Sequence, residues 1–415
     1  MKKITKIICG ILSICTVFSF IACKTVENTE TIKLTIWVPE SDKTFALQVV
    51  KGFEKANPEK KYSFNIDVQG ENELATRLLN DVEAGADVFA YPNDQIGKLI
   101  NGDALTRIAG NRLEIIKSEN SVEAIQSATA IVNEEEGVYG MPYTDNSFFL
   151  YYDKSVFNEE DVQTIDGILA KCSADKKFAF PITDGWYTTA FFFGKGLGYE
   201  VKYGDALAEM EIRCDFDSPT GEQVAQAMWE LVKDGRVKSD SNDSKLTAGF
   251  NDGSIVAGVS GIWNRRSIEE SLRGNFAVAK LPTYTLNKGQ ESEEQVQLVS
   301  FTGYKLMGVN NYSKVKAEAL AFAQFYTNKE NQILRFEQRG AVPTNLEARK
   351  SEKVQMDVCA KAITEQLKHS KIQVNVPSTL WVPMEGFGNA MITGVQNGSF
   401  NVKEQLAACV AGIKK

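Results

Sequence analysis

The sequence contains a single histidine and no cysteine spacing of the kind that binds zinc. His369 lies in a Lys-flanked stretch typical of an exposed helix end, which argues against a catalytic or metal-binding role. None of the seven cysteines forms a CxxC pair, which excludes zinc-ribbon and thioredoxin-like motifs. In an oxidising compartment, disulfide formation stays open for Cys172, Cys214, Cys359 and Cys409. Cys409 has a helical core spacing, which favours a buried free thiol.

A basic stripe is also missing, and the chain carries a formal net charge of −8. Loss of residues 1–22 would remove only lysines among the charged residues, so the mature charge becomes about −11. This acidic balance argues against a nucleic-acid partner. The chain has no internal repeat and no low-complexity tract. With 415 residues, 43% of them apolar and 24% charged, it has the length and composition of a two-domain globular protein.

The longest apolar run, from Ile7 to Ala22, is too short for a transmembrane helix, which needs about 20 residues. It follows a basic start and ends in a small residue, a pattern typical of a secretory signal at 1–22. The ending Phe20-Ile21-Ala22-Cys23 resembles a bacterial lipobox. In that interpretation Cys23 becomes the lipidated N-terminus and residues 23–30 form a polar tether. The alternatives are a freely secreted protein and an uncleaved anchor.

Hydrophobic periodicity predicts the order of the first elements. Alternation predicts strands at 32–38 and 62–68, and apolar stripes predict a helix after each strand. A third apolar run, 88–90, predicts a buried strand that stops at Tyr91-Pro92, because proline cannot continue a central ladder. This βαβαβ order predicts an α/β fold with a parallel sheet and right-handed crossovers.

Polar and aromatic residues follow the carboxyl ends of the first and third predicted strands. They are Asp42 and Lys43 after the first strand, and Tyr91 and Asp94 after the third. Ligands of α/β proteins bind in the crevice at this edge of the sheet, so we expect these residues to face one crevice. A ring beside a carboxylate suits a polyhydroxylated ligand, because the ring covers C–H groups and the acid accepts hydrogen bonds from hydroxyls.

Two tryptophans later in the chain follow the same pattern. Trp186 comes after the Asp184-Gly185 turn, and Trp263 follows a buried strand predicted at 254–259. Large rings in polar loops are expected either to bind a ligand or to be buried. We interpret both tryptophans as ligand platforms and assign the neighbouring aromatic run 191–193 to core packing.

Several segments together carry a family resemblance. They are Ile36-Trp37 with Asp42-Lys43, Asp87 through Asp94, Tyr139-Gly140-Met141-Pro142 with Tyr151 through Lys154, Phe250-Asn251-Asp252-Gly253 with Gly261-Ile262-Trp263, and Arg339-Gly340-Ala341-Val342-Pro343. In this order and spacing, over roughly residues 32–413, the chain resembles the extracellular solute-binding proteins of bacterial ABC importers, closest to the maltodextrin-binding group.

The resemblance implies a two-lobe, periplasmic-binding-protein-like fold of the α/β class. Each lobe would hold a mainly parallel sheet flanked by helices. Lobe one would comprise 31–144 with 284–340, and lobe two 145–283 with 341–415. Crossovers near 144 and 283, with the turn at 339–343, would form the hinge. Ligand binding would then shift the population from the open form to the closed form.

The resemblance also implies roles for individual residues. Asp42, Lys43 and Asp94 from lobe one and Asp184 from lobe two would hydrogen-bond sugar hydroxyls, while Trp186 and Trp263 would stack on sugar rings. Tyr91 takes the place of a family tryptophan, Gln95 that of an arginine, and Asn146 or Asp145 that of a crossover glutamate. The C-terminal stacking tryptophan aligns near Met384, so Trp381 or Phe387 would substitute for it. Because Gln95 cannot form the paired hydrogen bonds that the family's arginine makes, the identity of the sugar stays open.

Together with the lipobox-like leader, the resemblance implies a non-enzymatic substrate-binding lipoprotein without a cofactor or metal. It would capture a maltodextrin-like sugar and deliver it to the permease of an ABC importer, as a monomer anchored by lipid to the bacterial membrane and facing the periplasm or the cell exterior. The alternatives are the same scaffold tuned to a peptide, polyamine or metal ion, a surface adhesin, and an exported glycan hydrolase with Asp94 and Asp184 as paired acids. Absent catalytic signatures argue against the hydrolase, and the single histidine argues against a metal ion.

Overall fold

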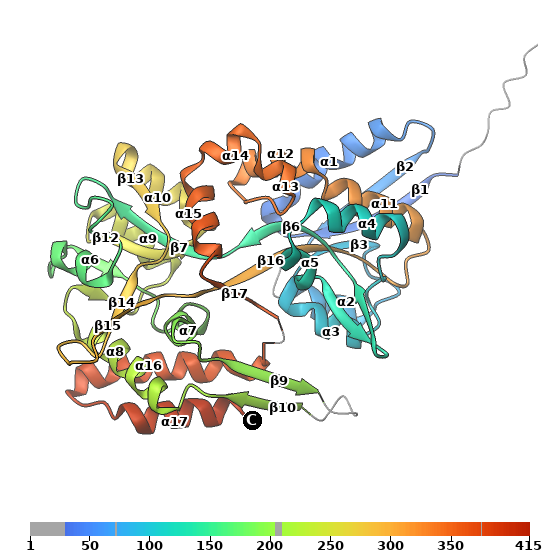
Figure 1. Ribbon diagram of the computed structural model, residues 1–415. Coiled ribbons are helices and arrows are strands. Elements are labelled where there is room, and N and C mark those ends of the chain that lie inside the picture. The colour runs from blue at the N-terminus through green and yellow to red at the C-terminus, as the bar shows by residue number, and fades with distance from the viewer. Residues whose placement is uncertain (1–29, 71–72, 204–209, 375) are drawn as a thin grey trace, which may run out of the picture.

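The computed structural model describes residues 30–70, 73–203, 210–374 and 376–415. The predicted signal at 1–22 and lipid attachment at Cys23 lie outside the described residues. Two α/β lobes lie side by side, each built on its own sheet (Figure 1). The two-lobe α/β fold expected from the sequence is therefore confirmed. The four described cysteines are free thiols, and Cys409 is buried as its spacing predicts.

The sheet of lobe one combines three N-terminal strands with strands from later in the chain. Its strands are β1 (Ile32–Val38), β2 (Tyr62–Val68), β3 (Val88–Pro92), β6 (Met141–Asn146), β16 (Ser300–Val309) and β17 (Ser370–Ile372). Their order is β17-β16-β3-β1-β2, and β6 also pairs with β16. β1 runs parallel to β2 and β3, as the βαβαβ pattern predicts, whereas β16 is antiparallel to β3 and β6.

Helices cover both faces of this sheet. They are α1 (Lys43–Ala56), α2 (Leu74–Asn80), α3 (Ile96–Asn101), α4 (Gly110–Glu119), α5 (Val122–Ser127), α11 (Lys316–Tyr326) and α12 (Lys329–Arg339), with a hairpin of β4 (Thr129–Val132) and β5 (Glu135–Val138). Apolar residues three or four positions apart give α1 one buried face, which includes Phe45, Val49 and Phe53. The Phe53 ring packs edge-on against Phe322 of α11, with centroids 5.2 Å apart.

The sheet of lobe two has the order β11-β8-β12-β7-β13. These strands are β7 (Phe148–Asp153), β8 (Lys177–Ala179), β11 (Val237–Lys238), β12 (Ile255–Gly261) and β13 (Phe276–Ala279). β8 runs parallel to β11 and β12, while β7 is antiparallel to β12 and β13. The core expected for the run 191–193 is present, since all three phenylalanines are buried there.

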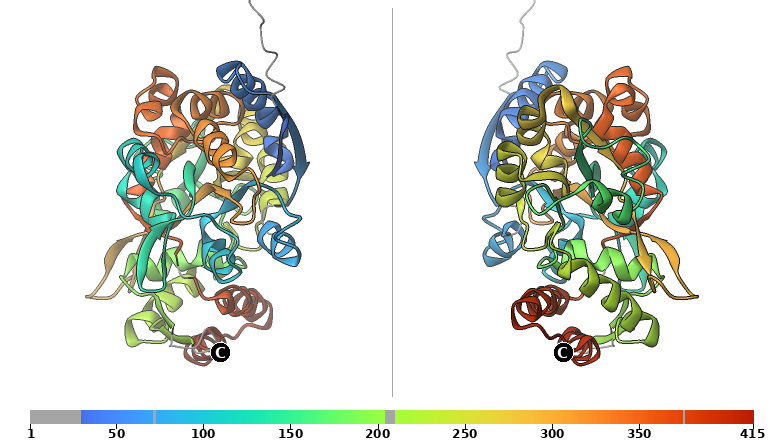
Figure 2. Two further views of the ribbon diagram at one scale, coloured as in Figure 1. Left: turned by 90° about the vertical axis from the view of Figure 1, so that its right-hand side faces the viewer. Right: turned by 90° about the vertical axis from the view of Figure 1, so that its left-hand side faces the viewer.

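The described residues form ten more α-helices, most of them around the second sheet, and two hairpins. The helices are α6 (Ile165–Lys171), α7 (Gly185–Gly194), α8 (Pro219–Lys233), α9 (Asp243–Asp252), α10 (Arg265–Leu272), α13 (Leu346–Arg349), α14 (Glu352–Met356), α15 (Val358–Leu367), α16 (Trp381–Asn397) and α17 (Val402–Ile413). The hairpins are β9 (Tyr199–Tyr203) with β10 (Met210–Cys214), and β14 (Thr283–Leu286) with β15 (Glu294–Gln297). α13 and α14 lie on the opposite side of the molecule from α16 and α17 (Figures 1 and 2). Within the part of the chain that the structure describes, none of the helices combines the length and apolar character needed to span a membrane.

Two extended segments pass between the lobes next to each other. β6 of lobe one continues into β7 of lobe two through Ser147, whose hydroxyl donates to the Phe301 carbonyl at 2.9 Å. β16 makes the return passage, because Phe301 is buried in the core of lobe two and Leu306 in the core of lobe one. The paired crossings give the lobes a joint made of strands, about which they can rotate.

The second crossing differs from the prediction near 283. Residues 284–299, assigned to lobe one from the sequence, pack on lobe two instead. The β14–β15 hairpin buries Tyr284 and Val296 in that core, and the Tyr284 hydroxyl donates to the Phe191 carbonyl at 2.9 Å. The passage to lobe one therefore begins at Ser300, the first residue of β16. The prediction was wrong because alternation identifies a strand but not the sheet or core in which that strand packs.

Candidate ligand-binding cleft

A cleft of about 990 Å³ lies between the lobes. Lobe one contributes Asp94 and Gln95 from a 3₁₀ turn (Asn93–Gln95), together with Asn146 at the end of β6. From lobe two the lining residues are Pro181, Thr183, Asp184, Gly185, Trp186, Tyr187, Ser241, Asn242, Asp243, Val259, Trp263, Trp381 and Glu385. Gln373, just after β17, completes the lining. Both lobes therefore contact the same space, as binding by hinge closure requires.

Trp186 is positioned by the start of α7. Asp184 caps this helix, and its carboxylate accepts a hydrogen bond from the Trp186 backbone N–H at 2.9 Å. Gly185 is buried against α16, where a Cβ would lie 2.8 Å from the Met384 Cβ. The close approach of α7 to α16 therefore requires glycine at position 185. This approach places Trp186, in the first turn of α7, at the cleft.

Trp263 stands at the carboxyl end of β12, as predicted. It lies in a 3₁₀ turn (Ile262–Asn264), and its indole Nε1 donates to Asp243 Oδ2 at 2.9 Å. The ring folds over Gly261, where any Cβ would collide with it. The side chain remains 43% exposed, which leaves one face of the ring available to a ligand.

The two indoles form an angled aromatic wall. The Trp186 and Trp263 ring centroids are 5.8 Å apart, with 42° between the ring planes. Trp186 also packs on Phe148 at 4.7 Å, and the Trp381 ring packs on Phe301 at 6.0 Å. Since each ring is fixed by a packed neighbour or a hydrogen bond, the wall is ordered before a ligand arrives.

The charged residues that line the cleft are all acidic: Asp94, Asp184, Asp243 and Glu385. Burial raises the pKa of Asp94 above its ordinary value. Burial also raises the pKa of Asp184, with the charges of Asp243 and Glu385 adding to the effect. Such a surface repels anions and offers acceptors to a ligand with many hydroxyls or with a positive charge. The described residues contain no group of three or more His, Cys, Asp or Glu arranged to hold a metal ion.

Six of the residues predicted to bind the ligand line this cleft: Asp94, Asn146, Asp184, Trp186, Trp263 and Trp381. Tyr91 does not, which corrects the prediction that it shares the crevice. It is 1% exposed within β3, and its hydroxyl donates to the Tyr139 carbonyl at 3.2 Å. Among the described residues, the pairing of β3 with β1 ends at Phe89, and Tyr91 and Pro92 pair with β16 alone. The strand can therefore continue through Pro92, because a proline is tolerated where one side of a strand has no partner.

Asp42 and Lys43 are also placed differently from the prediction. Asp42 is fully buried and accepts hydrogen bonds from Arg335 Nε at 3.1 and 3.2 Å, and it also pairs with Arg339. Arg335 in turn donates to the Thr144 hydroxyl. Both carboxylate oxygens of Asp42 are thus engaged by α12 of the same lobe. Lys43 is exposed in the first turn of α1 and does not line the cleft.

Asp145 and Phe387 likewise lie outside the cleft. Asp145 is fully buried and forms an ion pair with Arg349 of α13, and its backbone N–H donates to the Val342 carbonyl at 3.0 Å. Of the two candidates for the crossover position, only Asn146 reaches the cleft, because successive residues of a strand point to opposite sides. Phe387 is 3% exposed and packs near Phe400, so Trp381 is the C-terminal ring at the cleft.

The sequence reasoning missed several cleft residues, chiefly Ser241, Asn242, Asp243, Gln373 and Glu385. Asn242 is the N-cap of α9, and its side chain accepts a hydrogen bond from the Lys245 N–H. Asparagine is a typical N-cap residue, so the sequence did contain a signal for a helix start at Asn242. The preceding strand β11 has only two residues, which is too short for a periodic pattern. The Ser241 hydroxyl is buried without a hydrogen-bond partner in the described chain. No local signal marks Gln373 or Glu385.

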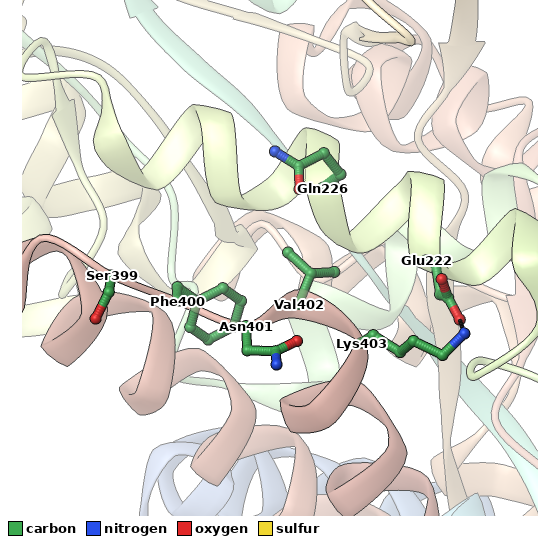
Figure 3. A pocket seen from close by; sticks show the side chains of 7 residues that line it. All are labelled: Glu222, Gln226, Ser399, Phe400, Asn401, Val402 and Lys403. Carbon is green, nitrogen blue, oxygen red and sulfur yellow. Dashed lines mark ion pairs between the residues drawn. The ribbon is translucent and has the colours of Figure 1, made fainter.

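A second hollow, of about 580 Å³, lies between α8 and the start of α17 (Figure 3). An ion pair between Glu222 and Lys403 spans it at 3.0 Å. Its one aromatic ring, Phe400, is already stacked on Trp229 with centroids 4.8 Å apart. All of its lining residues belong to lobe two, so rotation of the lobes cannot enclose a ligand there.

Comparisons with known proteins agree with the two-lobe fold. A maltooligosaccharide ABC transporter solute-binding lipoprotein of Streptococcus pneumoniae is 22% identical over 94% of this chain and 90% of its own length. A galactooligosaccharide-binding protein of Bacillus subtilis is 23% identical over 87% of this chain and 85% of its own. The solved structure of the maltodextrin binding protein MalE1 from L. casei, without ligand, superposes with a TM-score of 0.77 and 26% identity, over 93% of this chain and 100% of that one.

The family model described as bacterial extracellular solute-binding protein matches residues 48–362. This range includes most of lobe one, both crossing strands β6 and β16, and the aromatic wall of the cleft. The chain therefore belongs to the bacterial extracellular solute-binding protein family.

Proposed function

We propose that this protein captures a maltodextrin-like oligosaccharide in the cleft between its lobes and delivers it to the permease of an ABC importer. The observation that carries the proposal is the pairing of Trp186 and Trp263 as an angled aromatic wall in a cleft whose charged groups are all acidic. The maltooligosaccharide- and galactooligosaccharide-binding relatives support the choice of a sugar.

The chemistry of the wall and the acids complements that of a sugar. A pyranose ring presents C–H groups on its faces, which pack on indole rings, and hydroxyls on its edge, which donate to carboxylates. Asp94 from lobe one and Asp184 from lobe two line the same cleft, so closure of the lobes would bring both carboxylates to the ligand. Sugar binding therefore favours the closed form by the free energy of these added contacts. The permease would recognise that closed shape.

A thermal-shift panel of mono- and oligosaccharides tests the proposal. A sugar that binds only the native state, added at about 100 times its Kd, stabilises the protein by about 2.7 kcal/mol. We expect maltotriose or a longer maltodextrin to raise the melting temperature and inorganic phosphate to leave it unchanged, because the acidic cleft repels anions. If no carbohydrate raises the melting temperature and spermidine does, the acidic cleft binds a cationic ligand instead of a sugar.

The hydrolase alternative is tested with the same preparation. Paired acids cleave a glycosidic bond only when one donates a proton while the other attacks the sugar or activates water. A binding protein should release no reducing ends from maltodextrin during prolonged incubation. Turnover that Asp94→Asn or Asp184→Asn abolishes would instead identify an enzyme.

We further propose that the mature protein is a monomer held at the membrane by a lipid on Cys23. The lipobox-like ending of the leader and the lipoprotein relative of Streptococcus pneumoniae support this anchor.

Cys23→Ser removes the thiol that would carry the lipid, so the variant should leave the membrane fraction and appear in the soluble fraction. Fractionation and immunoblotting measure the distribution. A Cys172→Ser variant is the control, since Cys172 lies in lobe two and should not alter localisation. Continued membrane association of Cys23→Ser contradicts lipidation at that residue.

A further inference from the structure

Gln373 lies at the point where the joint between the lobes meets the cleft. Its backbone N–H donates to the Thr302 carbonyl of β16 at 2.8 Å. Its backbone carbonyl accepts from Asn93 Nδ2 at 2.6 Å, and Asn93 Oδ1 accepts from the Tyr304 N–H at 2.8 Å. Asn93 is buried directly beside the cleft residue Asp94. These bonds fix the Gln373 backbone to lobe one.

The Gln373 side chain reaches the other lobe. Its Oε1 accepts a hydrogen bond from the Trp186 indole Nε1 at 3.0 Å. An indole nitrogen can only donate, so the oxygen of the amide must face Trp186 and the NH₂ group must face away from it. The orientation of this amide is therefore determined by its partner.

The fixed amide leaves a donor for the ligand. The Gln373 NH₂ group makes no hydrogen bond with the described residues, while the residue itself lines the cleft. Every charged residue at the cleft is a carboxylate, which accepts but does not donate when ionised. A sugar also carries ring and glycosidic oxygens, which accept but cannot donate, and the acids cannot satisfy them.

We propose that Gln373 is a specificity-determining residue whose NH₂ group donates to an acceptor oxygen of the bound sugar while its carbonyl oxygen holds Trp186 in place. The inference rests on the proposed sugar-binding function. It adds a residue whose side chain would contact both the ligand and Trp186 while its backbone is bonded to lobe one. Since Gln373 is bonded to both lobes, its contact with the ligand also depends on their relative position.

Two substitutions separate the roles of the amide. Gln373→Glu retains an oxygen that can accept from Trp186 but replaces the donor with a second acceptor in an acidic cleft. Gln373→Met has similar length and removes both groups. Calorimetry with maltotriose at pH 8 should give an affinity about tenfold weaker for both variants, the scale of one lost hydrogen bond and an unsatisfied partner. The fluorescence emission of the ligand-free protein should shift in Gln373→Met and remain unchanged in Gln373→Glu.

The control is Gln290→Glu, which makes the same change in charge on the exposed β14–β15 loop and should bind maltotriose like the wild type. Melting temperatures of all variants without sugar establish that each is folded. Wild-type affinity in Gln373→Glu overturns the donor role, and an unchanged emission spectrum in Gln373→Met overturns the positioning of Trp186. If the wild type itself binds no sugar, the proposed function fails, and this inference fails with it.

Discussion

Replacement of Asp42 by alanine is expected to lower the free energy of unfolding by about 3–5 kcal/mol, because it leaves buried positive charge without its partner. Asp42 is fully buried and pairs with Arg335 and Arg339 of α12. Arg335 is 3% exposed, so water cannot replace the lost carboxylate. Urea denaturation of the wild type and the variant measures the change.

An exposed ion pair provides the matched control. Arg266 and Glu270 pair along α10 with the Glu270 side chain 67% exposed, so Glu270→Ala should change stability by less than about 1 kcal/mol. Equal losses in the Asp42 and Glu270 variants would contradict a structural role for the buried pair. Retained sugar affinity in a folded Asp42→Ala variant would agree with the position of Asp42 outside the cleft.

The same ion pair predicts a dependence on pH. Burial alone would raise the pKa of the Asp42 carboxyl, but the charges of Arg335 and Arg339 outweigh burial and hold that pKa below its usual value of 3.8. A carboxyl with a lowered folded pKa adds stability above its unfolded pKa, and this contribution is lost as the pH falls through the folded pKa. The stability difference between wild type and Asp42→Ala should therefore be constant above about pH 5 and shrink below about pH 4. A difference that grows in acid would contradict the ion pair.

Trp263→Ala and Trp186→Ala are each expected to weaken maltodextrin affinity by about 1–3 kcal/mol, a factor of roughly 5–150 in Kd. Each substitution removes one plane of the aromatic wall, whose ring centroids are 5.8 Å apart. Trp263 gives the cleaner measurement, because its ring is 43% exposed and its removal leaves no core cavity. Trp186 packs on Phe148, so its variant needs a melting temperature alongside the calorimetric Kd.

Trp229→Phe is the control for the tryptophan variants. Trp229 stacks on Phe400, which lines the hollow shown in Figure 3, and Trp229 is not among the residues that line the cleft. Its replacement should leave the affinity for maltodextrin unchanged. Wild-type affinity in both cleft variants would exclude the aromatic wall from sugar binding. Weaker maltodextrin affinity in Trp229→Phe would instead indicate that the sugar binds in the second hollow.

Residues whose surroundings are local were placed correctly from the sequence. Trp186 follows a helix cap and Trp263 follows a buried strand, and both features are formed by neighbours in the chain. Asp94 follows β3 in the same way. For Asp94 and Trp263, the carboxyl end of the preceding strand was enough to predict a place at the cleft, and for Trp186 the Asp184-Gly185 turn was, which the structure shows to be the start of α7.

Residues whose partners are distant in the chain were placed incorrectly. The partners of Asp42 are nearly 300 positions away on α12, and nothing near Asp42 indicates that two arginines will reach it. Asp145 and Asn146 are adjacent, yet only the second reaches the cleft, because the pleat turns Asp145 toward Arg349. Tyr91 was misplaced because the length of β3 depends on β16, whose pairing residue Leu306 lies more than 200 positions later in the chain.

By itself, the sequence predicted the first strands and helices, because periodicity and capping act over a few residues, and the family resemblance carried by its motifs implied two lobes. It also placed the tryptophans at strand and helix ends. Only the tertiary structure decided which lobe receives the β14–β15 hairpin, which acids are neutralised by arginines, and that Gln373 joins the cleft to both lobes. The physical reason is that a buried charge or amide takes its partner from whatever packing brings within about 3 Å, and packing depends on the whole chain.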